Sequence, residues 1–146
     1  KNCVSFYNPS SFDVVTSNPP YMNDGGGLKN DFSAKTIARH EVLCSLDDVV
    51  SAAARLLKTN GRFYMVHRPH RLVDIMVTLR NFKLEPKTMR LVYPNLNKEP
   101  NIVLIEAIKN GRPMLKNLPP LIIYDENGNY TQDYLNIHYG EKEDLK

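Results

Sequence analysis

Four consecutive residues, Asn18-Pro19-Pro20-Tyr21, carry the groups that chemistry on a planar amine requires. The Asn18 side chain offers a carbonyl oxygen, and Pro19 offers a backbone carbonyl in a segment whose φ is fixed by the proline ring. Two neighbouring acceptors can hold both protons of an exocyclic amine, such as that of adenine, and make it more basic. Tyr21 is placed to stack on the base. The spacing predicts alkylation of such an amine, with these four residues as the catalytic group.

The same four residues can also form a simple tight turn after a strand. The preceding segment favours the catalytic interpretation, because residues 12–17 are a short apolar run rich in β-branched side chains that ends abruptly at Asn18-Pro19. This run predicts a buried strand with the motif at its carboxyl end. Open α/β sheets bind ligands at that end of their strands.

A second polar group, residues 67–71, follows another predicted strand at 62–67. The carboxyl ends of parallel strands meet at one edge of a sheet, so we expect the two groups to lie there on neighbouring strands. We predict that Arg68 and Arg71 bind the substrate by contacting RNA phosphates. The alternative is ordinary surface charge at the start of a helix.

Histidine occurs in two pairs of nearby residues, Arg39-His40 and His67 with His70. Arg39 and His40 come soon after the motif and are expected to help bind the substrate, whereas pairing of Arg39 with a neighbouring carboxylate is the competing interpretation. His67 and His70 have the spacing of a metal-binding pair, but they lack cysteine or carboxylate partners. No metal site is predicted.

The remaining pattern predicts an α/β fold. Expected elements are strands at 12–17, 62–67, 88–93 and 102–109, a helix starting within 37–44, a helix from Ser45 to Asn60-Gly61, and a helix from Pro69 to Phe82. Ser45 and Asp48 form a capping box, and Asn60-Gly61 resembles a helix end. The loop 94–101 is too short for a crossover helix, so the last two strands pair antiparallel. A surface stretch at 111–120 and a less ordered acidic tail follow.

The composition is that of one globular domain, with 146 residues, 42% of them hydrophobic and 24% charged. No apolar run approaches the roughly 18 residues of a membrane span, and no signal peptide is recognised. Two cysteines are too few for a disulfide framework, so a cytoplasmic location is expected. Residues 1–124 hold 17 Lys or Arg against 10 Asp or Glu, a net charge of +7, and residues 125–146 hold 2 against 6, a net charge of −4. A basic body suits RNA as the partner, although ordinary surfaces reach the same charge.

Residues 12–21, Phe-Asp-Val-Val-Thr-Ser-Asn-Pro-Pro-Tyr, resemble motif IV of the class I S-adenosylmethionine-dependent methyltransferases that modify planar amines and amides. The resemblance implies a partial Rossmann-like sheet, with strands four to seven, the last one antiparallel, and flanking helices. Residues 1–146 would form the carboxyl-terminal part of one methyltransferase domain, with 111–146 as an extension. S-adenosylmethionine is the implied cofactor, and Asn18 would contact it as well as the substrate.

Three further segments look most like the bacterial tRNA-Val adenine-N(6) methyltransferases, which implies tRNA as the substrate. They are residues 38–41, 67–69 and 120–131. The glycine-rich cofactor loop of the family is absent, since Gly25-Gly26-Gly27 does not have its spacing. We therefore expect the cofactor-binding amino-terminal half to be missing and the chain alone to be inactive. Methylation of a protein glutamine, as in release factors, methylation of a ribosomal RNA base, and a non-catalytic RNA- or protein-binding module remain as alternatives.

Overall fold

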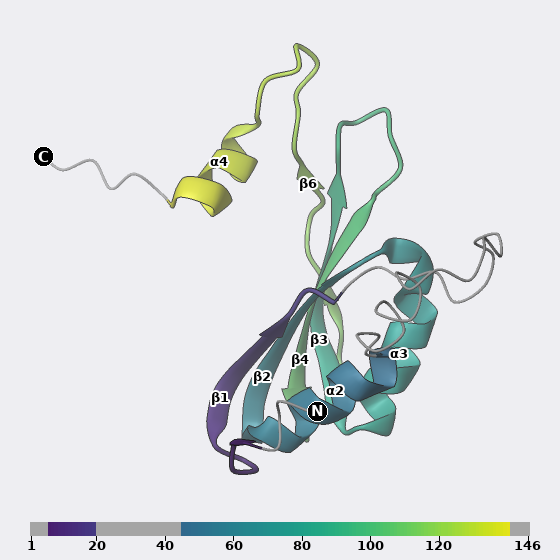
Figure 1. Ribbon diagram of the computed structural model, residues 1–146. Coiled ribbons are helices and arrows are strands. Elements are labelled where there is room, and N and C mark those ends of the chain that lie inside the picture. The colour runs from purple at the N-terminus through teal and green to yellow at the C-terminus, as the bar shows by residue number, and fades with distance from the viewer. Residues whose placement is uncertain (1–5, 20–44, 141–146) are drawn as a thin grey trace, which may run out of the picture.

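The computed structural model describes residues 6–19 and 45–140, and its centre is a mixed sheet with two helices packed on one face (Figure 1). In spatial order the main strands are β1 (Phe12–Ser17), β2 (Leu57–His67), β4 (Ile102–Lys109) and β3 (Leu84–Tyr93). β1 and β2 are parallel, and β4 runs antiparallel to both of its neighbours. The predicted α/β order with one reversed strand is confirmed.

The two helices begin where local sequence signals predict. α2 (Leu46–Leu56) starts at the Ser45 capping box, in which the Ser45 hydroxyl accepts the Asp48 N–H at 3.1 Å and the Asp48 carboxylate accepts the Ser45 N–H at 2.9 Å. Pro69 opens a short 3₁₀ turn, η2 (Pro69–Arg71), which leads into α3 (Leu72–Asn81).

The predicted boundary between the first of these helices and the second strand is wrong. α2 ends at Leu56 and β2 begins at Leu57, so that Asn60 and Gly61, the predicted helix end, lie inside the strand. Asn60 has a φ of 64°, and the pairing with β1 is irregular at this point. A Cβ on Gly61 would lie 3.2 Å from the Asp13 carbonyl oxygen of β1. The Asn-Gly pair therefore lies at an irregularity of β2, where the backbones of β2 and β1 approach each other closely.

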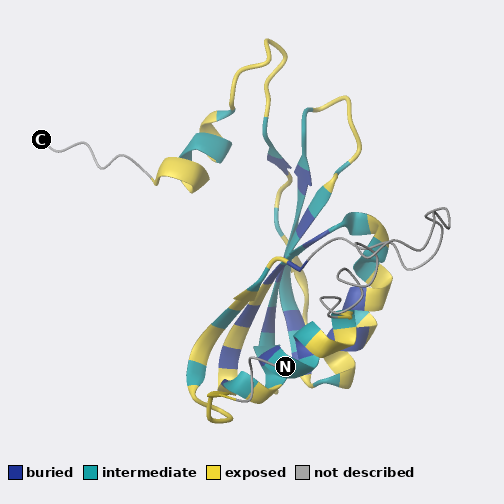
Figure 2. Cartoon of the chain, viewed as in Figure 1, coloured by how far each residue is buried: buried dark blue, intermediate teal, exposed yellow. Residues whose placement is uncertain are grey.

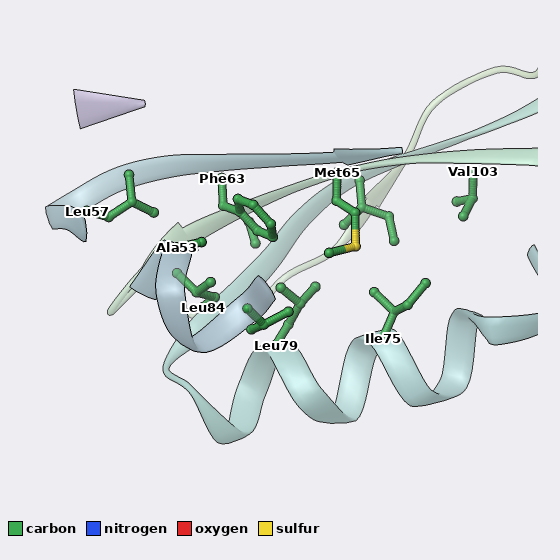
Figure 3. Packing of buried hydrophobic residues seen from close by; sticks show 11 residues of the cluster. Ala53, Leu57, Phe63, Met65, Ile75, Leu79, Leu84 and Val103 are labelled. Carbon is green, nitrogen blue, oxygen red and sulfur yellow. The ribbon is translucent and has the colours of Figure 1, made fainter. Parts of the chain in front are cut away.

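The core lies between the sheet and the two helices. Phe63 and Met65 of β2 and Val103 of β4 meet Ile75 and Leu79 of α3, as the close view shows (Figure 3). By contrast, no residue of β1 is buried, although a buried strand is predicted there (Figure 2). The reason is that β1 is the edge strand among the described elements and pairs only with β2.

The carboxyl-terminal region is more regular than predicted. The short strands β5 (Lys116–Asn117) and β6 (Leu121–Ile122) pair in parallel with β3, and Thr131 caps α4 (Gln132–Tyr139). The free edge of β3 supplies backbone partners for these segments, which is why residues 121–140 do not form the loosely ordered tail expected from their charge. None of the described helices is both long enough and apolar enough to cross a membrane.

Candidate active site at the carboxyl edge of the sheet

Asn18 and Pro19, the described part of the first polar group, lie at the same edge of the sheet as residues 67–71. Ser17 of β1 pairs with Met65 of β2, so Asn18 and His67 follow at the ends of neighbouring strands. Asn18 is exposed, whereas Pro19 is buried. The predicted juxtaposition is therefore confirmed, and it leaves the Asn18 side chain accessible to a ligand. Pro20, Tyr21, Arg39 and His40 lie outside the described residues.

Asn18 lines a cavity of about 600 Å³ on the sheet face opposite α2 and α3. The pairing of β1, β2, β4 and β3 places Thr16, Tyr64, Glu106 and Thr88 in one row across its floor. Most of the other lining residues are apolar. The polar row is thus the main source of specific polar contacts within this cavity.

Glu106 is the acceptor that organises this row. Its carboxylate accepts hydrogen bonds from Arg62 Nη1 at 2.6 Å, from the Tyr64 hydroxyl at 3.2 Å and from Thr88 Oγ1 at 2.8 Å. Burial by itself raises the pKa of Glu106, but the hydrogen bonds from Thr88, Arg62 and Tyr64 outweigh it and hold that pKa below its ordinary value. The group therefore stays ionised and orders its neighbours, which makes it a poor general base.

Glu106 is not among the site residues predicted from the sequence. The available signal was one acidic residue within the otherwise mostly apolar strand at 102–109. A carboxylate on a strand face needs partners, and these come from two other strands.

The cationic residues at the end of β2 have different surroundings. Arg68 Nη1 donates to the Asn101 carbonyl oxygen at 2.9 Å, and a second cavity of about 600 Å³ is lined by residues 68–70 and 99–101. Arg71 Nε lies 2.8 Å from Asp74 Oδ2 on its own helix. The structure places Arg68 at a cavity separate from the one that Asn18 lines, and Arg71 pairs with Asp74; substrate binding by either residue stays a prediction.

His67 is nearly inaccessible, with 6% of its surface exposed, and its Nδ1 accepts the Arg68 backbone N–H at 2.8 Å. Burial lowers the pKa of His67, and the charges of Arg71 and Arg68 lower it further. The neutral ring is thus the form that the fold accommodates. No cluster of three metal-binding side chains occurs among residues 6–19 and 45–140.

This burial predicts a pH dependence of stability. The unfolded chain binds a proton at His67 more readily than the folded chain, so we expect the free energy of unfolding to be highest above about pH 6.5 and to fall as the pH drops below it. In His67→Asn, whose side-chain oxygen can accept the Arg68 N–H, this fall should be smaller. Urea unfolding between neutral and mildly acid pH measures it, and equal slopes for both proteins would contradict the assignment.

No model of a protein family matches the sequence. The chain is 25% identical over 138 residues to the tRNA1(Val) (adenine(37)-N6)-methyltransferase of Aeromonas hydrophila. This match covers 94% of this chain and 56% of that protein. The enzymes of the same name from Porphyromonas gingivalis and Trichodesmium erythraeum are 27% and 29% identical, and each match covers 86% of this chain. The chain spans about half the length of these curated relatives.

Solved structures show the same relationship at the level of the fold. A protein described as a predicted O-methyltransferase from Agrobacterium tumefaciens matches with a TM-score of 0.67 and 20% identity over 90% of this chain and 53% of its own. The chain therefore shares part of the fold of that protein. A candidate DNA modification methylase from Thermus thermophilus, solved with S-adenosyl-L-methionine, matches the chain with a TM-score of 0.52 and 21% identity, over 76% of this chain and 53% of its own.

Proposed function

We propose that this chain is the carboxyl-terminal half of an S-adenosylmethionine-dependent methyltransferase domain that methylates the exocyclic amine of adenine in tRNA, in the cytoplasm. The observation that carries the proposal is the position of Asn18 and Pro19 at the carboxyl end of β1, at the rim of a cavity and next to the cationic end of β2. The tRNA substrate is supported by the names of the curated relatives.

In this proposal the chain binds and orients the target amine. The Asn18 side-chain oxygen and the Pro19 carbonyl each accept one proton of the amine, which directs its lone pair away from both acceptors. The amine remains neutral until the new bond forms, so no strong base is needed, which agrees with the engagement of Glu106 by three donors. The base itself has to leave its stack to reach the strand end, with Tyr21 as the proposed stacking partner.

The described residues fit the methyl donor only in part. S-adenosylmethionine, when bound, supplies an electrophilic methyl group, and Asn18 is the described residue that we assign to its vicinity. The carboxylate in the cavity, Glu106, already accepts three hydrogen bonds and does not suit the ribose hydroxyls. We therefore assign the nucleoside part of the cofactor to residues other than those described here.

The test is methyl transfer from tritium-labelled S-adenosylmethionine by the full-length polypeptide that contains this chain. Unmodified bulk tRNA, ribosomal RNA and a release factor are offered as separate substrates. We expect label in tRNA, recovered as N(6)-methyladenosine after digestion to nucleosides. Label in ribosomal RNA or in a release-factor glutamine would replace the tRNA assignment, and the absence of label from all three would refute methyl transfer to these substrates.

A further inference from the structure

A row of aromatic rings lies along the carboxyl-terminal arm, residues 118–140. Tyr124 stacks on Tyr130 with ring centroids 5.0 Å apart, Tyr130 on Tyr134 at 4.8 Å, and Tyr134 on His138 at 5.5 Å, with interplanar angles of 24°, 23° and 11°. This aromatic row remains at the surface, since Tyr124 is 38% and Tyr130 47% exposed and α4 buries no residue. It is therefore not part of a hydrophobic core.

The arm is held in place by polar contacts that also engage most of its acidic side chains. Arg90 of β3 forms an ion pair with Asp133 of α4. The Asp125 carboxylate accepts the backbone N–H groups of Asn127 and Asn129, both at 2.9 Å. The ion pair with Arg90 offsets the charge of Asp133, and the hydrogen bonds to Asp125 fix the backbone on which the aromatic row is built.

The aromatic row begins at the loop whose other end contacts the carboxyl end of β2. The Tyr124 N–H donates to the Pro94 carbonyl at 2.9 Å, and the loop that starts at Pro94 ends at Asn101, whose carbonyl accepts from Arg68. The arm extends beyond the edge of the sheet that carries Asn18 (Figure 1). Tyr124 is thus the end of the row that lies nearest the cationic end of β2.

We propose that the aromatic row is a stacking surface for unpaired bases of the RNA substrate that flank the target nucleotide. The inference rests on the proposed function and adds to it the part of the chain that holds the substrate. Planar bases continue a stack of nearly parallel rings, and aromatic side chains are the usual platforms for single-stranded RNA. Arg68, which contacts the other end of the 94–101 loop, can bind the phosphates that connect such bases.

The inference can be tested by RNA binding with this chain. The probes are a fluorescein-labelled single-stranded oligoadenylate and a duplex of the same length, both read by anisotropy. We expect Tyr124→Leu to weaken binding of the single strand about tenfold, because one stacking ring is lost. Tyr124→Phe keeps the ring and should bind like the unchanged chain. Tyr7→Leu, at an exposed tyrosine before β1, is the matched control and should also leave binding unchanged.

A second readout does not depend on any variant. The chain has 8 tyrosines and no tryptophan, so stacking of bases on the aromatic row should quench its tyrosine emission. Three results would each overturn the inference. Tyr124→Leu could bind the single strand as tightly as the unchanged chain does, the unchanged chain could bind the duplex as tightly as the single strand, or binding could leave the tyrosine emission unquenched. If the chain binds and is quenched but the full-length polypeptide transfers no methyl group, the proposed function fails and the stacking surface stands. If full-length Tyr124→Leu methylates tRNA with an unchanged KM, the stacking surface is refuted and the proposed function stands.

Discussion

Asn18→Ala in the full-length polypeptide is expected to lower kcat for methylation of tRNA by about 100- to 1,000-fold, the usual cost of removing one polar group that contacts the reacting centre. The KM for tRNA should change little, because the acceptor acts on the amine and RNA affinity comes from other contacts. Steady-state transfer of labelled methyl groups at several tRNA concentrations separates the two constants.

Two further variants sharpen this experiment. Asn18→Asp keeps an acceptor oxygen in the same place and should lose less activity than the alanine variant. Asn81→Ala makes the same chemical change at the exposed end of α3, away from the carboxyl edge, and should leave kcat unchanged. If Asn18→Ala retained kcat within a few-fold, Asn18 would not hold the amine.

Phe63→Ala is expected to reduce the free energy of unfolding by about 3–5 kcal/mol, because it leaves a cavity where β2 meets both helices. Phe63 is 1% exposed and pairs with Val15 of β1 and Ala107 of β4, so neighbouring backbone limits how far the cavity can collapse. Urea unfolding followed by circular dichroism gives the change from the midpoint at constant slope.

The matched control for this core substitution is Phe6→Ala. Phe6 is 85% exposed, and its truncation should change the free energy of unfolding by less than about 0.5 kcal/mol. A similar loss in both variants would show that Phe63 does not pack as described. A lower slope in Phe63→Ala would instead indicate a change in the unfolding transition itself.

The elements whose signals are local could be predicted from the sequence. The Ser45 capping box and Pro69 each mark a helical start through residues close together in the sequence. The loop 94–101 is short enough to make its two strands antiparallel. The same applies to the shared edge of Asn18 and His67, because strand order and direction follow from the α/β alternation.

The predictions that failed depend on residues far apart in the sequence. Asn60-Gly61 suits a helix end and a strand irregularity equally well. A Cβ on Gly61 would lie 2.8 Å from the nearby Lys58 carbonyl oxygen and 3.2 Å from the Asp13 carbonyl oxygen on the paired strand. Burial of β1 was predicted from its composition, whereas burial depends on the strands beside it. The polar row that contains Glu106 crosses four strands. α4 could have been predicted from the sequence. Thr131 as its cap, with tyrosines at 130 and 134, is a local signal for the start of a helix.

The edge position of β1 affects the order in which the sheet can form. β3 and β4 are joined by one short loop, whereas Phe12 finds its partner Leu57 only after a long chain closure. Closing such a separation costs more entropy than closing a hairpin, so this parallel pairing belongs to the slow, late steps of folding. Among the described strands, the backbone that carries Asn18 therefore depends on β2 alone for its pairing, and its position at the site is set by that one parallel contact.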